Sequence, residues 1–280
     1  MRIDPHTHTT RSDGRSTPTQ LMSEAAAAGL DMIGLTDHDT ITGWDEGAQC
    51  VPASGVALIR GMEISAMYHG ITLHMLGYLF DPQAPAIQKH IAEVRESRVG
   101  RAYEMVERLG RDFPITWEDV TRHIEPGATV GRPHIADALV EAGVVENRAE
   151  AFTQLLNPRS PYYVWHKAAE ATDAIEWIND AGGRAVFAHP AAPHRNRVVP
   201  RVAFEEFAEA GLFGIEIDHR DNVKDSRPEL AALARRLHLA RFGSSDYHGL
   251  GKPNRLGEHT TSEAVIEALI QSCHLEVLYP

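Results

Sequence analysis

The 280-residue chain contains only two cysteines, Cys50 and Cys273, too few for a disulfide framework or a thiolate metal site. No apolar run approaches the ~20 residues of a membrane span, and no basic segment with an apolar core opens the chain as in a signal peptide. Basic residues are in deficit, because 27 lysines and arginines face 39 aspartates and glutamates, a net charge of −12. We therefore expect a cytoplasmic protein with no membrane contact and no stable nucleic-acid complex.

The residues that are present describe a globular α/β protein. Hydrophobic residues make up 43% of the chain and charged residues 24%, and the length suits one large barrel or two ordinary domains. Short apolar segments are predicted strands, at residues 2–4, 31–36, 56–63, 71–76, 184–188, 214–218, 239–243 and 275–278. Helical patterns separate most of them, at residues 17–29, 42–49, 168–181, 201–210, 228–237 and 262–271. This alternation predicts a parallel sheet closed as a barrel.

Residues 82–162 lack strand patterns and carry apolar residues at helical spacing. We predict an inserted helical subdomain over 82–162 that caps the substrate. The metal-binding barrel is then formed by residues 1–81 and 163–280. Thr17 followed by Pro18 predicts the start of the first helix, and Gly29 its end.

Histidine is the unusual residue, with sixteen copies, and several follow apolar strands. His6 and His8 would lie on one side of the first strand, since side chains alternate with period two. Chance is the alternative for one His-x-His, but nearly every predicted strand carries a metal-ligand residue at or near its end. These residues are His6, His8, Asp37, His38, Glu63, His74, His189, Asp218, His219, Asp246 and His248. Carboxyl ends of parallel strands meet at one end of a barrel, so we expect a metal centre there.

These segments resemble the motifs of the polymerase and histidinol phosphatase (PHP) superfamily of metal-dependent phosphoesterases. The motifs are His6-Thr7-His8 with Ser12-Asp13-Gly14, Thr36-Asp37-His38-Asp39, Gly61-Met62-Glu63, Ala188-His189-Pro190 and Ser245-Asp246-Tyr247-His248. The resemblance covers nearly the whole chain and implies a distorted (β/α)7 barrel with three divalent metals, commonly manganese, iron or zinc. Pro5 departs from the pattern, because the family usually has an apolar residue such as leucine there.

The resemblance also implies the ligands of each metal. The first metal would take His6, His8, Glu63 and Asp246, the second Glu63, His74 and His189, and the third Asp13, His38 and His248. Nitrogen and carboxylate ligands suit borderline-to-hard divalent ions, and a hydroxide bridging two such ions is nucleophilic at neutral pH. Asp37 and Asp39 are expected to orient histidines, and His219 to protonate the leaving oxygen.

A segment of the insert narrows the substrate. Val130-Gly131-Arg132-Pro133-His134-Ile135-Ala136 resembles a motif of PHP enzymes that act on nucleoside 3′,5′-bisphosphates and on 5′-ends of short RNAs. We expect Arg132 and His134 to bind substrate; the alternatives are a salt bridge at a helix start and a structural histidine. Further phosphate contacts are expected from the residues Lys167, His194 and Arg197, for which plain surface positions are the alternative.

The sequence therefore predicts hydrolysis of a nucleotide phosphate ester, above all release of the 3′-phosphate of adenosine 3′,5′-bisphosphate. Three other functions stay open. They are a 5′→3′ exonuclease of short RNA or DNA, a histidinol-phosphate phosphatase, and a non-catalytic metal-bound regulatory or structural domain. Manganese is the expected metal, with iron or zinc as alternatives, because the ligand types suit all three.

Overall fold

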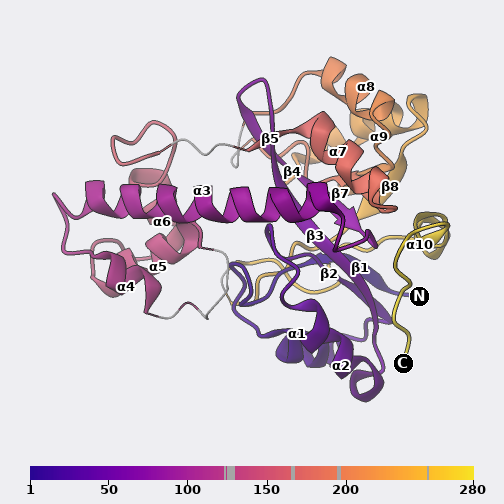
Figure 1. Ribbon diagram of the computed structural model, residues 1–280, viewed down its shortest axis with the longest axis horizontal. Coiled ribbons are helices and arrows are strands. Elements are labelled where there is room, and N and C mark those ends of the chain that lie inside the picture. The colour runs from indigo at the N-terminus through magenta and orange to yellow at the C-terminus, as the bar shows by residue number, and fades with distance from the viewer. Residues whose placement is uncertain (123, 125–129, 165–167, 194–196, 251) are drawn as a thin grey trace.

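The computed structural model describes residues 1–280 apart from 123, 125–129, 165–167, 194–196 and 251, and shows one curved sheet wrapped by helices (Figure 1). The main strands follow in the order β1 (Ile3–Thr7), β2 (Met32–Leu35), β3 (Ala57–Tyr68), β4 (Ile71–Tyr78), β6 (Arg184–Phe187), β7 (Gly214–Asp218) and β8 (Ala240–Gly243). A short strand, β5 (Ala169–Glu170), pairs with β3. The chain after β8 returns to β1, where the His8 amide donates to the Tyr247 carbonyl at 2.8 Å. The predicted distorted seven-stranded barrel is confirmed.

One strand departs from the predicted parallel sheet. β4 is antiparallel to both β3 and β6, so the prediction of parallel strands throughout is wrong. Only His69 and Gly70 separate Tyr68 from its partner Ile71, and both have positive φ, 45° and 78°. A two-residue turn of this kind makes a hairpin, whereas a parallel partner needs a crossover of a dozen residues. His74 therefore lies near the start of β4 and still reaches the end of the barrel where the parallel strands finish.

Six helices pack around the barrel (Figure 1). They are α1 (Pro18–Ala27), α2 (Trp44–Ser54), α7 (Ala171–Asp180), α8 (Arg201–Glu209), α9 (Arg227–Arg236) and α10 (Glu263–Ile270), with a 3₁₀ turn at Lys224–Ser226. α1 begins as predicted, because Thr17 and Gln20 form a capping box and Pro18 occupies the first turn. The strand predicted at 275–278 is wrong, since that segment makes only an isolated bridge between Leu278 and Leu58.

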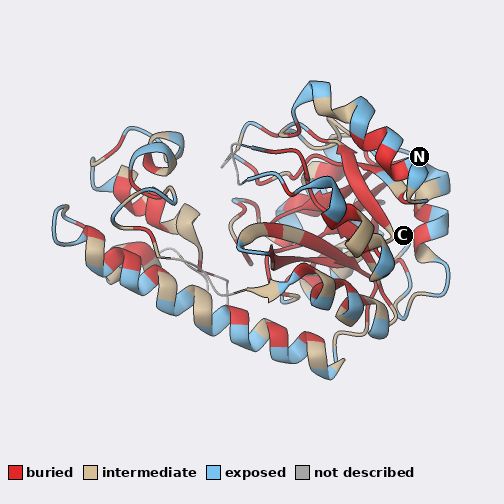
Figure 2. Ribbon diagram, turned by 90° about the horizontal axis from the view of Figure 1, so that it is seen from above, coloured by how far each residue is buried: buried red, intermediate tan, exposed pale blue. Residues whose placement is uncertain are grey.

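The insert consists of four helices, α3 (Pro85–Leu109), α4 (Trp117–Thr121), α5 (Arg132–Glu141) and α6 (Arg148–Gln154). The 25-residue α3 starts beside the barrel and runs outward to the other three helices. These three helices lie away from the barrel (Figure 2). These helices share a core that is separate from the barrel's, with Met105, Leu109, Ile135 and Leu139 at its centre. The described residues of this region are helical, as expected. The division into a barrel of residues 1–81 and 163–280 and a substrate-capping subdomain of residues 82–162 stays a prediction. None of the described helices combines the length and apolar character that a membrane span requires.

Apolar side chains fill the barrel toward the amino ends of the parallel strands. Ile3, Leu76, Val186 and Phe242 belong to this core, which α10 also contacts. The polar residues of β1 come after Ile3, so they lie toward the carboxyl ends. The barrel interior is therefore apolar near the amino ends of the parallel strands and polar near their carboxyl ends.

Candidate metal centre

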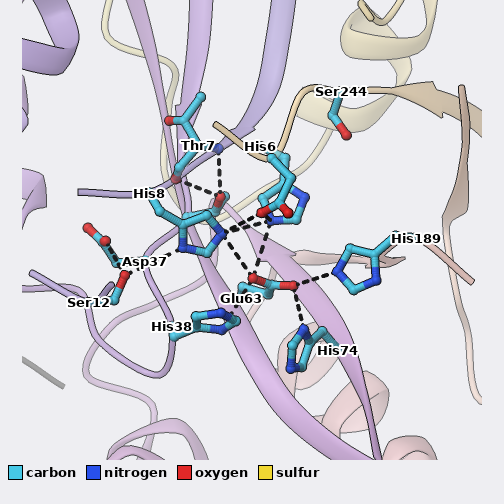
Figure 3. Close-up of polar contacts among 12 residues, drawn as sticks. His6, Thr7, His8, Ser12, Asp37, His38, Glu63, His74, His189 and Ser244 are labelled. Atoms are coloured by element: carbon cyan, nitrogen blue, oxygen red, sulfur yellow. Dashed lines mark hydrogen bonds and ion pairs between the residues drawn. The ribbon is translucent and has the colours of Figure 1, made fainter. Parts of the chain in front are cut away.

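The two histidines of the first motif stand side by side at the end of β1, as alternation predicts (Figure 3). Their Nε2 atoms lie 3.0 Å apart, and both residues are fully buried. Glu63 and Asp246 approach the same point. Glu63 Oε2 lies 3.3 Å from His6 Nε2 and 3.0 Å from His8 Nε2, and Asp246 Oδ1 lies 3.4 and 3.1 Å from these two atoms. The four side chains predicted for the first metal are thus brought together.

The two carboxylate oxygens of Glu63 face different histidines. Oε1 lies 2.8 Å from His74 Nδ1 and 3.1 Å from His189 Nε2, while Oε2 faces His6 and His8. His74 comes from β4 and His189 from the turn after β6, so the antiparallel hairpin and the barrel both contribute (Figure 3). This arrangement puts Glu63 between the side chains predicted for the first and the second metal.

Asp13, on the loop after β1, collects the remaining predicted ligands. Its Oδ1 lies 3.1 Å from His248 Nε2, and its Oδ2 lies 3.9 Å from His38 Nε2. His8, Asp13, His38 and His248 form one group whose ligand atoms all lie within 4.8 Å of one another. His38 also approaches Glu63, with 3.2 Å between Nδ1 and Oε2. The nine predicted ligands are therefore contiguous, and His38 stands between two groups rather than in one.

The ligand atoms themselves show whether a metal fits. Within the described residues, several buried side-chain atoms of this centre have no hydrogen-bond partner. They are Asp13 Oδ1, His38 Nδ1, Glu63 Oε2, His74 Nδ1 and His248 Nε2. Buried polar atoms without partners are rare because each costs about 1–3 kcal/mol. A divalent cation would satisfy several of them at once, and nitrogen and oxygen atoms without thiolate suit manganese, iron or zinc. The residues present fit divalent metals.

Electrostatics lead to the same conclusion. Burial alone lowers the pKa of His8, but hydrogen bonds to Asp246 and Glu63 raise it to about 9. Burial also raises the pKa of Glu63, yet His38, His74 and His6 hold it well below its usual range. The carboxylates thus stay ionised and attract protons onto neighbouring imidazoles. Divalent cations would replace those protons.

Glu216 is a further member of the centre that sequence reasoning missed. Its Oε1 accepts from His6 Nδ1 at 2.9 Å and from the Ser244 hydroxyl, and its Oε2 accepts from the His189 amide at 2.8 Å. Burial raises the pKa of Glu216, but the charge of His6 and its hydrogen bond to Glu216 lower it to about 2. A signal was available, because Glu216 lies between Ile215 and Ile217 in a strand whose alternation points it into the barrel. A carboxylate behind a metal-ligating histidine fixes the ring and its tautomer.

The two aspartates predicted to orient histidines behave differently. Asp37 accepts from the Thr9 amide at 2.8 Å and from the Ser12 hydroxyl at 2.5 Å, and Ser12 in turn lies 3.4 Å from His8 Nδ1. The Asp39 carboxylate contacts Ser65, His90 and Arg98, and among the described residues it pairs with none of the predicted ligands. Burial opposes ionisation of Asp39, but Arg98 and His90 hold its pKa well below the usual range.

Two of the predicted substrate residues, Arg132 and His134, lie at the start of α5 in the insert. Arg132 opens α5, donates to the Leu156 carbonyl at 3.1 Å, and stacks on Phe152 and Tyr163 at 5.3 and 5.5 Å. His134 Nδ1 accepts from the Gly131 amide at 3.1 Å, a helix-capping contact, and burial lowers the pKa of His134.

The other predicted contacts cannot all be placed. Arg197 is exposed and lines a small pocket together with His74 and His189. Lys167 and His194 lie outside the described residues. His219, the predicted proton donor, is buried after β7, and its ring centre lies 5.3 Å from that of His189 and 6.4 Å from that of His6.

Known proteins resemble this chain over most of its length. The PHP domain model matches residues 4–116. A 3′,5′-nucleoside bisphosphate phosphatase from Chromobacterium violaceum is 33% identical over 259 residues, 92% of this chain and 91% of the relative. A 5′-3′ exoribonuclease from Haemophilus influenzae is 33% identical over 247 residues, 88% and 90% of the two chains.

A solved structure also resembles the fold of this chain over nearly its whole length. This protein, from Bifidobacterium adolescentis and described as a metal-dependent phosphoesterase, is 40% identical with a TM-score of 0.93 over 96% of this chain and 95% of that one. The centre built from strand ends and these relatives agree, and the chain belongs to the PHP family of metal-dependent phosphoesterases.

Proposed function

We propose that this phosphoesterase releases the 3′-phosphate of a nucleoside 3′,5′-bisphosphate, with adenosine 3′,5′-bisphosphate as the first candidate and AMP and phosphate as products. Such a substrate carries two phosphates, so it needs two sites of positive charge. The metal centre supplies one of them. The second site is supported by a pair of arginines in the insert.

Arg101 and Arg132 are the observation that carries the proposal. Among the residues that the structure describes, no carboxylate pairs with either guanidinium. Arg101 Nε donates to the Val164 carbonyl at 2.7 Å and its guanidinium stacks on Tyr163 at 4.9 Å, but its buried Nη2 has no described partner. Burial and then the charge of Arg132 lower the pKa of Arg101 to about 10. Two partly buried cations, of which Arg101 has a donor without a described partner, favour a phosphate, which accepts from guanidinium forks.

The proposed function also includes three metal ions at the metal centre. We assign one to His6, His8, Glu63 and Asp246, a second to Glu63, His74 and His189, and a third to Asp13, His38 and His248. When bound, these ions supply an activated nucleophile and neutralise the charge of the reacting phosphate. Glu63 would serve as a ligand of the first two ions, and Glu216, which accepts from His6 Nδ1 at 2.9 Å, would leave Nε2 of His6 for the first ion.

His219 is the proposed donor of a proton to the leaving 3′-oxygen. Its Nδ1 accepts from the Asp221 amide at 3.0 Å, so a proton carried by the neutral ring belongs on Nε2. The ring lies beside His189 and His6, near the reacting phosphate of this proposal. Arg197, which lines the pocket with His74, is a further phosphate contact in this proposal.

A second candidate is stepwise hydrolysis of short RNA from its 5′-end. It is supported by the Haemophilus influenzae exoribonuclease, whose identity to this chain is also 33%. The arginine pair would then hold the 5′-phosphate, and the metal centre would attack the first phosphodiester. Both reactions need an anion at the same distance from the centre.

One experiment separates the two reactions. Manganese-loaded protein is given adenosine 3′,5′-bisphosphate, adenosine 3′-monophosphate and a 5′-phosphorylated tetraribonucleotide, and phosphate and nucleotide products are followed by chromatography. We expect the highest kcat/KM with the bisphosphate and a much lower value with the monophosphate. Faster release of mononucleotides from the tetramer would favour the exonuclease, and no turnover of any of the three would defeat both proposals.

A further inference from the structure

A buried carboxylate links the insert to the metal centre. Asp39 follows His38 directly in the chain and is 1% exposed. Both of its oxygens accept hydrogen bonds from Ser65 of β3, Oδ1 from the amide at 2.7 Å and Oδ2 from the hydroxyl at 2.8 Å. The Asp39 amide donates to the Glu63 carbonyl at 3.0 Å. Asp39 is therefore fastened to the same stretch of β3 that carries Glu63.

The remaining contacts of Asp39 come from α3. Arg98 Nη2 lies 2.8 Å from Asp39 Oδ2, and His90 Nε2 lies 3.4 Å from Oδ1. Arg98 comes eight positions after His90, about two helical turns, so both side chains leave nearly the same side of α3. The His90 ring also packs on Trp177 of α7, with 5.6 Å between ring centres. One carboxylate thus holds two turns of the insert's longest helix against the barrel.

Arg98 reaches the arginine pair as well. A Cβ built on Gly131, the residue before Arg132, would lie 3.7 Å from Arg98 Nη1. Burial is the largest cause of the lowered pKa of Arg101 and of Arg132, and the positive charge of Arg98 lowers both pKa values further. Arg98 therefore stands between Asp39, beside the metal centre, and the start of α5.

We infer that Arg98 is a positioning residue, which through Asp39 fixes the distance between the metal centre and the arginine pair of the insert. The inference rests on the proposed function, because it assigns the two ends of that distance to the two phosphates. A substrate that bridges both ends requires this spacing. A small monoester that reaches only the metal centre does not.

The test compares two substrates in three variants. Arg98→Met removes the guanidinium and keeps much of the side-chain length, Arg98→Lys keeps the charge, and Arg95→Met removes an exposed arginine one turn away on α3. For Arg98→Met we expect kcat/KM to fall about 10²-fold with adenosine 3′,5′-bisphosphate, the size of effect that a displacement of about 1 Å produces. With p-nitrophenyl phosphate the fall should be much smaller. Arg98→Lys should recover most of the loss, and Arg95→Met should match the unmodified protein with both substrates.

A second readout needs neither metal nor turnover. The Ser65 amide donates to Asp39, so its hydrogen exchange in metal-free protein reports the link directly. We expect faster exchange of this amide, and of the α5 amides, in Arg98→Met than in Arg95→Met. Equal losses on both substrates, or unchanged exchange, would overturn the inference and leave the proposed function intact. An unmodified protein inactive on the bisphosphate would instead defeat the proposed function, and the exchange measurement would still decide the inference.

Discussion

The metal centre and the insert each bring side chains of like charge close together. The charges are negative in the metal centre and positive in the insert, and their neighbours differ. In the barrel, the carboxylates of Asp13, Glu63 and Glu216 stay ionised among buried histidines, some of which are driven to hold protons. In the insert, Arg101 and Arg132 face aromatic rings and carbonyl oxygens, with no described carboxylate in contact. Within the described residues, acidic side chains crowd the barrel centre, whereas the two insert arginines have no carboxylate partner. In the proposed function, divalent metals balance the charge of the first region and a substrate phosphate balances that of the second, and the apolar cores of the two regions are separate.

Removing the Glu63 carboxylate, which faces two groups of histidines, should lower activity more than any other change considered below. Glu63→Gln is expected to lower kcat by at least about 10³-fold, because the ions it holds contribute several kcal/mol of charge stabilisation and 1.36 kcal/mol is tenfold. Metal analysis should show fewer ions per chain. Glu209→Gln, an exposed glutamate on α8, is the matched control. Full metal content together with full activity in Glu63→Gln would contradict the centre described above.

Removing one arginine of the insert should weaken the use of substrate and leave the metal content unchanged. Arg101→Met is expected to lower kcat/KM for adenosine 3′,5′-bisphosphate about ten- to a hundredfold, because a hydrogen bond to a charged group contributes about 1.5–3 kcal/mol. Metal content should be unchanged. Arg111→Met, exposed in the same subdomain, serves as the control. If the loss were the same with adenosine 3′-monophosphate, Arg101 would not contact the second phosphate.

Glu216 tests whether the barrel's charge network matters beyond the ligands. Glutamine has one acceptor oxygen, so Glu216→Gln turns an amide nitrogen toward the His6 or the His189 donor. We expect manganese affinity to fall about ten- to a hundredfold, as for other carboxylates that orient metal-ligating histidines. Titration of metal-free protein against a chelator measures this. An unchanged affinity would limit Glu216 to a structural role.

The smallest change, about tenfold for a single pH unit, is expected from a pH dependence that is confined to the barrel. His8 carries a proton below its pKa of about 9 in metal-free protein, and a ligand must be neutral to bind metal. Manganese affinity should therefore rise with pH up to about 9, by about tenfold per unit for each proton displaced. Binding measured from pH 6.5 to 9 checks the slope. A flat profile would mean that His8 binds without losing a proton, whereas phosphate binding to the insert arginines should change little over this range.

Much of this was predictable because strand ends and side-chain alternation are local properties. The pairing of His6 with His8, the start of α1 at Thr17 and the convergence of the ligands needed no tertiary information. The direction of β4 depends on a two-residue turn whose conformation the sequence did not reveal, so parallel pairing was wrongly predicted.

Contacts between distant segments were harder to predict. His90 had no motif around it, yet it lies buried against Asp39, some fifty residues earlier in the chain. Arg101 was overlooked because one arginine on a helix resembles any other until its neighbours are known. The boundaries of the insert, the metal identity and the substrate contacts stay predictions.

The place where the insert joins the barrel has a consequence for how such enzymes diversify. It leaves the barrel after β4, and the chain returns at β5, which pairs with β3, so both connections meet the same hairpin. None of the predicted ligands lies between residues 82 and 162. We therefore expect that this contiguous stretch can be exchanged as one unit, so that a related barrel given another insert keeps its predicted metal ligands and takes a different substrate.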